Sequence, residues 1–309
     1  MGNSTFISSI TQKIFFLSLI VIALGIGLLS TPHHQPQTAP SSPVLPPTEK
    51  DIQYQSHSLE HSLVHSLLIP AGNRFLVTPA LSQRVSTLES FAQQQKVLAV
   101  INGGFFDPQN QKSTSIVIQQ GVMVADPQDN ARLINNPKLA PLLAKILDRT
   151  EFRRYRCNLT IRYDITVHSQ PTPPGCQLID ALGGGPSLLP ELTLIEEGFL
   201  DKANGRVIRD PLGSNQPNAR SAVGITHDGD ILWVMVAQKP ESPTNSGMSL
   251  ISLATFMKTF GVEKAMNLDG GSSSCLYYKG KTFYGKVDEK GNALKRNVLS
   301  VLLVRENKP

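Results

Sequence analysis

Residues 265–274 read AMNLDGGSSS, an apolar segment that leads directly into a polar, glycine-rich turn. The segment from Ala265 to Leu268 is short and mostly apolar, as expected of a buried strand. Paired glycines let the backbone approach a ligand closely, and Asn267 and Asp269 add side-chain donors and acceptors. Because binding residues commonly lie on loops held by a rigid sheet, this stretch predicts a functional site at a strand end.

Two other turns have the same construction. The sequence INGGFFD (101–107) ends a buried apolar run, and GGGP (183–186) follows the expected strand 178–182. A helix, a short strand, an asparagine and two glycines recur in the same order at 80–104 and 249–271, which favours an internal duplication over coincidence. Two such units side by side would direct their glycine turns into one cleft.

Hydrophobic spacing and turn residues predict the remaining elements. Helices are predicted over 80–95, over 250–260 (ended by Gly261) and around Leu142 to Leu147. Hairpins are predicted at Gln120-Gly121, at 227–230 and at Lys279-Gly280, and further strands at 75–78, 97–101 and 298–304. Alternation predicts a half-buried strand over 157–167 that includes Leu159. These elements predict the α+β class, a mixed β-sheet system with flanking helices in a single large domain over residues 51–309.

The first fifty residues differ in composition from the rest. Residues 14–30 are nearly continuously apolar, follow Lys13 and lack acidic residues, which predicts a signal-anchor or signal peptide over 1–31. No Ala-x-Ala sequence follows, which favours the uncleaved anchor. Residues 32–50 are rich in proline and predict an extended tether. We therefore expect an extracytoplasmic domain that is attached to a membrane through its N-terminal segment.

The charge of the chain indicates which kinds of partner it could bind, and its cysteines indicate the redox compartment. The net charge of +5 and the isoelectric point near 9.1 come from scattered Lys and Arg residues, and only 153–156 form a basic cluster. Without a basic helix or an aromatic stacking motif, no nucleic-acid partner is expected, and the charge suits an anionic substrate or an acidic envelope. Cys157 and Cys176 could form a disulfide in an oxidising compartment. Cys275 is expected to be a buried thiol, with a nucleophilic role as the alternative.

Five segments occur in a fixed order between about residues 70 and 305: Asn102–Asp107, Gly183–Leu188, Ala219–Gly224, Gly247–Ser249 and Asn267–Ser273. Together they resemble the phosphodiester glycosidase family. That family includes the lysosomal uncovering enzyme, which removes N-acetylglucosamine from a phosphodiester, and bacterial exopolysaccharide-associated proteins. One glycine turn could match by chance, but five in order point to the family. The sequence departs from the family at residues 296–298, which read RNV in place of Arg-Pro-Val, and in the longer segment 130–174.

The chemistry of a sugar-1-phosphodiester indicates which residues could act on it. Asp269 is the best-placed carboxylate for acid/base or nucleophilic catalysis, with an Asx-type turn as its structural alternative. Arg220 could clamp phosphate with two hydrogen bonds or form a structural ion pair. Asn102 would orient hydroxyl or phosphate oxygens, with turn capping as its alternative. The candidate substrate-binding residues are Gly103, Gly104, Asp107, Gly184, Gly185, Asn267, Gly270, Gly271 and Ser272.

Other candidates carry less specific signals. Asp107 precedes a proline, which favours a turn-initiating role over a second carboxylate or a metal ligand. Glu196 and Glu197 are carboxylates for which a solvated turn is expected. The sequence lacks zinc-binding and EF-hand spacings, and a divalent cation with oxygen ligands near Asp269 or Asp107 is left open.

The resemblance implies hydrolysis of a glycosyl-1-phosphodiester on envelope or extracellular glycans, which releases a sugar and a phosphomonoester. The alternative is a non-catalytic protein that binds phosphorylated or acidic polysaccharide during exopolysaccharide export or attachment. A transferase that passes the glycosyl-phosphate to an acceptor is a third interpretation. All three would use the same cleft and the same residues, so turnover and its products separate them.

Overall fold

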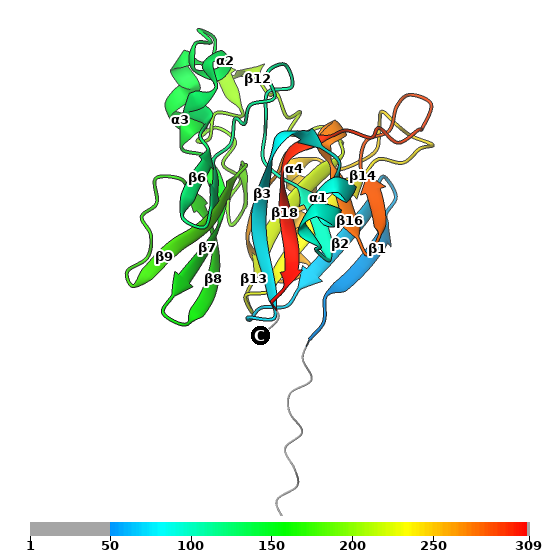
Figure 1. Ribbon diagram of the computed structural model, residues 1–309. Helices are drawn as coiled ribbons and strands as arrows, with labels where there is room; N and C mark the ends of the chain where they lie inside the picture. Colours follow the sequence, from blue (N-terminus) through cyan, green and yellow to red (C-terminus); the bar gives the residue numbers. More distant parts are fainter. Residues whose placement is uncertain (1–49, 308–309) are drawn as a thin grey trace, which may run out of the picture. The chain divides into compact units, whose positions relative to one another are not determined.

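The computed structural model describes residues 50–307, which fall in one compact unit (Figure 1). The predicted signal segment (1–31) and the predicted tether (32–50), apart from Lys50, lie outside the described residues. Strands make up 44% of the described residues and helices 14%, so β-sheets dominate the fold. The predicted α+β class is confirmed in part: sheets with flanking helices are present, but several sheets form most of the structure, and the helices are few and short.

The first sheet joins parts of the chain that are far apart in sequence. Its six strands, in spatial order, are β1 (Gln53–Ser58), β2 (Leu63–Ile69), β14 (Ile231–Ala237), β13 (Arg220–Thr226), β15 (Val262–Asn267) and β10 (Ser187–Leu189). Strands β13 and β14 form the predicted hairpin. In the antiparallel pair β13–β15, Ala222 lies opposite Asn267, so the third glycine turn lies beside the start of β13.

The second sheet carries the first glycine turn. Its five strands, in spatial order, are β17 (Lys281–Tyr284), β16 (Cys275–Tyr278), β4 (Ala99–Asn102), β18 (Val298–Glu306) and β3 (Phe75–Ser86). Strands β16 and β17 form the hairpin predicted at Lys279-Gly280. Strand β4 ends at Asn102, and therefore leads into the Gly103-Gly104 turn as the sequence predicts.

The third sheet packs beside the other two and includes the disulfide. Its strands are β6 (Val122–Ala125), β5 (Val117–Gln119), β9 (Cys176–Gly183), β7 (Thr150–Cys157) and β8 (Thr160–Val167), and a separate ribbon pairs β11 (Asp201–Ala203) with β12 (Arg206–Arg209). Cys157 and Cys176 lie opposite each other on β7 and β9 and form a disulfide. The strand predicted over 157–167 instead begins after a turn. Asn158 adopts the left-handed conformation there, and Leu159 is 94% exposed.

The two large sheets pack face to face and are covered by one helix on each outer face. Apolar residues of both sheets, among them Trp233 and Leu302, form the central core. Helix α1 (Leu88–Gln95) covers the outer face of the second sheet, and α4 (Leu250–Lys258) covers the outer face of the first. Strand β14 contributes alternate side chains to the two cores on either side of it. Because both faces are covered, all seven of its residues are buried.

The helix predicted over 80–95 begins later than its hydrophobic spacing indicates. Residues up to Ser86 belong to β3 and pair with β18. The helix starts after Thr87, whose side-chain oxygen accepts a hydrogen bond from the amide of Ser90 and so caps the first turn. Leu81 and Val85 fit the helical period, but pairing with β18 prevails over that local pattern. The second predicted helix is confirmed as α4, followed by Gly261 at a φ of 72°.

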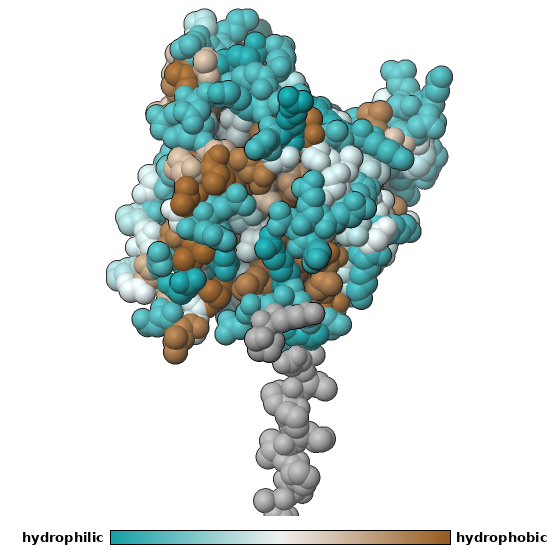
Figure 2. All heavy atoms as spheres, in the orientation of Figure 1, coloured by the Kyte–Doolittle hydropathy of each residue, from teal (hydrophilic) through white to brown (hydrophobic). Residues whose placement is uncertain are grey.

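Two short helices, α2 (Ala131–Ile134) and α3 (Leu143–Leu147), lie in the segment that precedes β7. The second confirms the helix predicted around Leu142 to Leu147. In Figure 2 the outer surface over these two helices is mostly hydrophilic. No helix of residues 50–307 is long and apolar enough to cross a membrane.

Candidate functional site

Backbone contacts bring the three glycine turns together beside the ends of β4 and β15. The amide of Asp269 donates a hydrogen bond to the carbonyl oxygen of Gly103 at 3.0 Å. The amide of Gly185 donates to the carbonyl oxygen of Asn267 at 2.8 Å. The first and second turns also touch, because a Cβ atom on Gly104 would overlap a carbonyl oxygen of the second turn. The turns therefore converge, as the repeated sequence pattern predicts.

The amides of the predicted glycine donors are all engaged within the protein. Gly103 donates to the carbonyl of Ser300, Gly104 to the hydroxyl of Ser300, Gly184 to the carbonyl of Thr150, Gly185 to the carbonyl of Asn267, Gly270 to the carboxylate of Asp269 and Gly271 to the carbonyl of Ala219. Each amide has a single proton to donate. These glycines therefore hold the turns against one another, and substrate contact at this site falls to side chains.

Asn102 is fully buried, and its side chain connects three parts of the site. Its Nδ2 group donates to the carbonyl oxygen of Asp269 at 2.6 Å. Its Oδ1 atom accepts hydrogen bonds from the hydroxyl of Ser221 at 2.6 Å and from the amide of Cys275 at 3.1 Å. With these bonds made, Asn102 fixes the position of the Asp269 turn, and a direct contact with substrate is not required of it.

Asp269 is the carboxylate that the turns position. Its Oδ1 atom accepts the amide hydrogen of Gly270 at 2.9 Å, and the residue remains partly exposed. Desolvation raises the pKa of Asp269 to about 6, against the opposing effects of hydrogen bonds from Ser273 and Gly270 and of the positive charge of Arg296. A carboxyl group with a pKa near 6 can exchange protons close to neutral pH, as acid/base catalysis requires.

Arg296 is a site residue that the sequence interpretation noted only as part of a departure from the family pattern. Its Nη1 group donates to the hydroxyl of Ser272 at 2.8 Å, and its guanidinium lies 5.4 Å from the ring centre of Phe106. Its positive charge opposes the effect of desolvation and lowers the pKa of Asp269. Arg296 therefore places a partly exposed positive charge beside the carboxylate.

A second cation, Lys286, reaches the same turn through Asn218. The Nζ group of Lys286 donates to the side-chain oxygen of Asn218 at 3.1 Å. The amide nitrogen of Asn218 would lie 3.9 Å from a Cβ on Gly271, so the lysine approaches the turn from that side. Desolvation and the nearby charge of Arg220 lower the pKa of Lys286. Two positively charged side chains therefore contact this turn or its neighbour Asn218, a combination that suits an anionic ligand.

Arg220 is almost completely buried and faces backbone carbonyls. It donates hydrogen bonds of 2.8 to 3.0 Å to the carbonyl oxygens of Leu212, Gly213, Gln216 and Met248. Desolvation lowers its pKa to about 10. These bonds hold the loop before β13 against the segment before α4. The guanidinium is therefore occupied by the protein itself, and Arg296 is better placed to contact a phosphate.

Two other predicted residues have distinct surroundings. Asn267 is buried, donates from Nδ2 to the carbonyls of Gly185 and Leu268, and leaves its Oδ1 atom without a partner among the described residues. Asp107 accepts the amide hydrogen of Gln109 and forms a 2.7 Å ion pair with Arg132, as a turn-initiating residue would. The structure therefore bonds Asn267 to the second glycine turn and ties Asp107 to its own loop and to α2.

Glu197 corrects the expectation of a solvated turn, because it is buried. Its carboxylate accepts hydrogen bonds from the amide and hydroxyl of Thr150, the amide of Ser187 and the hydroxyl of Thr193. Its backbone carbonyl accepts a hydrogen bond from Arg149. These contacts hold the second glycine turn in place. No local sequence signal distinguishes Glu197 from its exposed neighbour Glu196, so only the tertiary contacts reveal it.

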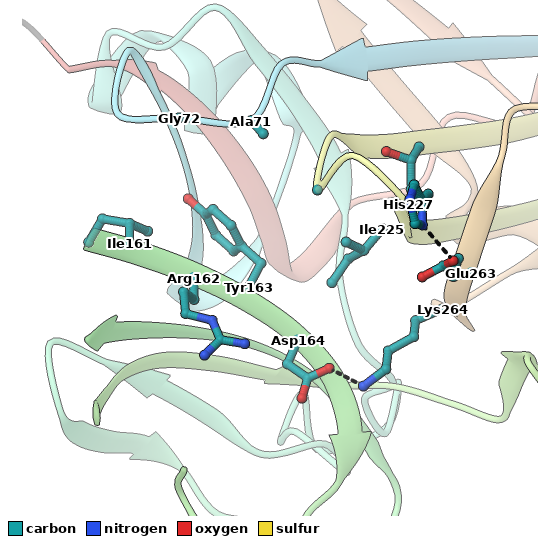
Figure 3. Close-up of a pocket in the computed structure, with 12 residues that line it drawn as sticks. Ala71, Gly72, Ile161, Arg162, Tyr163, Asp164, Ile225, His227, Glu263 and Lys264 are labelled. Atoms are coloured by element: carbon teal, nitrogen blue, oxygen red, sulfur yellow. Dashed lines mark hydrogen bonds and ion pairs between the residues drawn. The ribbon is translucent and has the colours of Figure 1, made fainter. Parts of the chain in front are cut away.

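Two surface cavities differ in their relation to the glycine turns. A cavity of about 370 Å³ is lined by Phe106, Lys295 and Arg296, and therefore adjoins the site. A cavity of about 390 Å³ lies at the opposite end of β13, where Lys264 pairs with Asp164 at 2.5 Å (Figure 3). His227 and Glu263 form a second pair there. Because those charges are satisfied within the protein and lie far from Asp269, the first cavity is the one relevant to the site.

The possible metal-binding side chains of residues 50–307 do not form a cluster. Among residues 50–307, no three His, Cys, Asp or Glu side chains are close enough together to hold a metal ion. Cys275 is buried, and desolvation raises its pKa, so the thiol remains protonated. The polar side chains at and beside the turn that remain to be considered are those of Asp269, Arg296, Lys286 and the hydroxyl-bearing residues 272–274.

The fold and the site define a β-sheet protein with a carboxylate of raised pKa on a glycine turn, flanked by cations suited to an anionic substrate. The family model of phosphodiester glycosidases matches residues 95–305. The chain therefore belongs to the phosphodiester glycosidase family, as its five ordered segments indicate. None of the curated proteins compared with the sequence matches it.

Three solved structures share the fold. The catalytic domain of zebrafish N-acetylglucosamine-1-phosphodiester alpha-N-acetylglucosaminidase, auto-inhibited by its pro-peptide, is 18% identical, with a TM-score of 0.59, over 83% of this chain and 82% of that one. A protein from Burkholderia pseudomallei described as exported is 16% identical, with a TM-score of 0.56, over 79% and 74%. A hypothetical protein from Synechocystis is 16% identical, with a TM-score of 0.53, over 82% and 62%. At these identities the comparison establishes the fold.

Proposed function

We propose that this protein hydrolyses a glycosyl-1-phosphodiester and releases a sugar and a phosphomonoester. The observation that carries the proposal is Asp269, a partly exposed carboxyl group with a pKa of about 6 on a turn fixed by Asn102. Membership of the phosphodiester glycosidase family supports it. The zebrafish relative acts, by its name, on an N-acetylglucosamine-1-phosphodiester, which is a substrate of this class.

The leaving group determines what the site must supply. A phosphomonoester has a second pKa near 6, so it departs from the anomeric carbon with little need for protonation. What it requires is stabilisation of the developing negative charge. Arg296, bound to Ser272, and Lys286, bound to Asn218, place positive charge near the turn. We assign the phosphate to these two residues rather than to the fully engaged Arg220.

Asp269 then has the role of proton acceptor. At neutral pH a carboxyl group with a pKa of about 6 is mostly ionised and still basic enough to take a proton from water. The activated water attacks the anomeric carbon, the bond between that carbon and the phosphate oxygen breaks, and the electron pair leaves with the phosphate. Direct attack by the Asp269 carboxylate is the second route, which would form a glycosyl-enzyme intermediate.

The experiment is phosphorus NMR of the purified full-length chain with a panel of sugar-1-phosphodiesters in oxygen-18 water, with and without a chelator. We expect a phosphomonoester, with the label on the sugar. Label on the phosphate would instead place the attack at phosphorus. Loss of turnover with the chelator would identify a divalent cation bound through oxygen ligands.

The matched variants are Asp269→Asn and Asp129→Asn, the second an exposed carboxylate outside the site. We expect the first to lose turnover by at least about 1,000-fold and the second to keep it, because one removes the proton acceptor. A fully active Asp269→Asn would refute the assignment. A chain that retains acidic glycan and never releases a phosphomonoester would instead be the non-catalytic polysaccharide-binding protein.

We further propose an extracytoplasmic location. The disulfide between Cys157 and Cys176 supports it, because such bonds persist in oxidising compartments. The apolar run at 14–30 supports export as well, and it would hold the protein at the membrane if it is not cleaved. Protease added to intact cells that produce the full chain should digest it. Complete protection until the cells are lysed would contradict the proposal.

A further inference from the structure

We propose that a groove next to the site binds the sugar units of an acidic oligosaccharide that carries the phosphodiester. The aromatic groove, as we call it, is lined by the rings of Tyr54, Phe283 and Tyr284 and has a volume of about 590 Å³. It runs between the β1–β2 edge of the first sheet and β17 of the second. The proposal rests on the proposed function, because it names the part of the substrate that lies beyond the cleaved bond.

The rings of the groove are held in place before any ligand binds. Phe283 stacks on His65 with ring centres 4.2 Å apart and on Tyr54 at 5.5 Å. The hydroxyl of Tyr54 bonds Nδ1 of His65 at 2.8 Å, so that pair satisfies its own polar atoms. Desolvation lowers the pKa of His65 to about 4, which keeps its ring uncharged at neutral pH. The groove therefore presents a rigid, neutral aromatic surface, and its side chains lose little conformational entropy when a ligand binds.

Two lysines lie over aromatic rings of the groove. Lys281 lies 4.9 Å from the ring centre of Phe283, and Lys295 lies 5.9 Å from that of Tyr284. Neither lysine forms an ion pair within residues 50–307, and no aspartate or glutamate lines the groove. The nearby carboxylate of Glu89 accepts hydrogen bonds from Thr282 and Tyr284. An occupant with negative charges would meet the two lysines and no opposing carboxylate in the lining.

Residues 284–296 lead along the chain from the groove to the candidate site. Tyr284 lies opposite Cys275, which follows the third glycine turn. Lys295 lies over Tyr284 and also lines the cavity that holds Arg296 and Phe106. A chain of sugars could therefore pass from the rings, along Lys295, to the cation beside Asp269.

These features together select a glycan. A pyranose ring has one face of C–H groups that packs on an aromatic ring, and hydroxyl groups at its rim that stay in water. The pocket is mostly apolar with polar atoms at its edge, as small-ligand sites are. The two lysines add a preference for carboxylate- or phosphate-bearing sugars, with binding that weakens as salt rises.

The test measures binding by calorimetry in the Asp269→Asn full-length chain, so that it does not depend on turnover. The probes are octagalacturonate, which is acidic, and maltooctaose, which is neutral. We expect octagalacturonate to bind at least tenfold more tightly than maltooctaose. We also expect Phe283→Leu, which keeps apolar volume but removes the ring, and the pair Lys281→Ala with Lys295→Ala each to weaken binding at least tenfold.

Lys290→Ala, an exposed lysine outside the lining, is the matched control and should bind as the parent does. Thermal unfolding of each variant shows whether a loss reflects misfolding, and the exposed lysine pair is expected to leave the fold intact. Equal binding by the parent and all groove variants, or no binding by the parent, would overturn the proposal. Equal affinity for maltooctaose and octagalacturonate would overturn it as well. Failure of hydrolysis with binding intact would refute the proposed function alone.

Discussion

The side-chain amide of Asn102 donates a 2.6 Å hydrogen bond to the backbone carbonyl of Asp269, 167 residues further along the chain. This bond joins the end of β4 in the second sheet to the turn after β15 in the first. The amide of Asp269 returns a bond to the carbonyl of Gly103. The carboxylate is therefore held by both sheets at once, and its position depends on how they pack together.

Asn102→Ala should destabilise the protein and displace the carboxylate. The hydroxyl of Ser221, the amide of Cys275 and the carbonyl of Asp269 would lose a buried partner. We expect the free energy of unfolding to fall by about 2–4 kcal/mol and kcat to fall more than KM rises. Denaturant titration and steady-state kinetics measure both, with the exposed Asn73→Ala as control. Unchanged stability and kcat would show that the bond has no positioning role.

Activity should depend on the ionisation of Asp269. If Asp269 accepts a proton, kcat/KM falls tenfold for each pH unit below about 6, where the carboxylate becomes protonated. A profile from pH 4.5 to 8, with circular dichroism at each point, separates this limb from acid unfolding. The residual activity of Asp269→Asn should lack the limb. A wild-type profile that is flat across pH 6 would contradict the role.

The ionised carboxylate of Asp269 should lower the free energy of unfolding at neutral pH. Its pKa is raised on folding, from 3.8 to about 6, so its favourable contribution exists below pH 3.8 and is lost as pH rises through 6. Asp269→Asn should therefore be more stable than wild type above pH 6, by up to about 3 kcal/mol, and no more stable near pH 3.5. Denaturant titration at the two pH values tests this. An equal difference at both would rule out the ionisation as its cause.

Two arginines of the site should respond differently to removal. Arg220→Ala would leave four carbonyl groups without their donor, so we expect a loss of at least about 3 kcal/mol in the free energy of unfolding. Arg296→Ala removes a partly exposed cation, so stability should change by less than about 1 kcal/mol. Its kcat/KM should fall about 100-fold through weaker phosphate stabilisation. If Arg220→Ala lost activity with little change in stability, and Arg296→Ala lost stability instead, Arg220 would be the residue that binds the phosphate.

Gly185 should not tolerate a side chain. It has a φ of +94°, and a Cβ atom there would overlap the Glu197 carboxylate. We expect Gly185→Ala to lower the free energy of unfolding by at least about 3 kcal/mol. Gly175→Ala is the matched control: its φ is +73° with nothing within 4 Å, so it should cost only about 1 kcal/mol. Similar losses would mean that backbone strain alone, without the overlap, sets the cost.

Local patterns predicted much of this structure because turn chemistry acts over a few residues. The Gln120-Gly121 hairpin, the hairpin of β13 and β14 and the Gly261 helix end follow from residues that adopt special backbone angles. The helix over 80–95 failed at its start, since Leu81 and Val85 fit both periods and only the pairing with β18 distinguishes them. The prediction that the strand over 157–167 includes Leu159 was also wrong. The alternation of apolar residues continues through the turn at Asn158, so the pattern alone does not reveal the turn.

The sequence by itself determined that three glycine turns follow buried strands, that Asp269 lies on one of them, and which family these segments indicate. Only the tertiary structure decided which atoms remain available to a ligand. In the folded protein, the glycine amides and Arg220 form hydrogen bonds to other protein groups, and Glu197 is buried. Folding also lets the charge of Arg296 act on the Asp269 carboxylate. The physical reason is that strand and turn preferences arise from neighbours in the chain, whereas hydrogen-bond partners and desolvation arise from residues that only folding brings together.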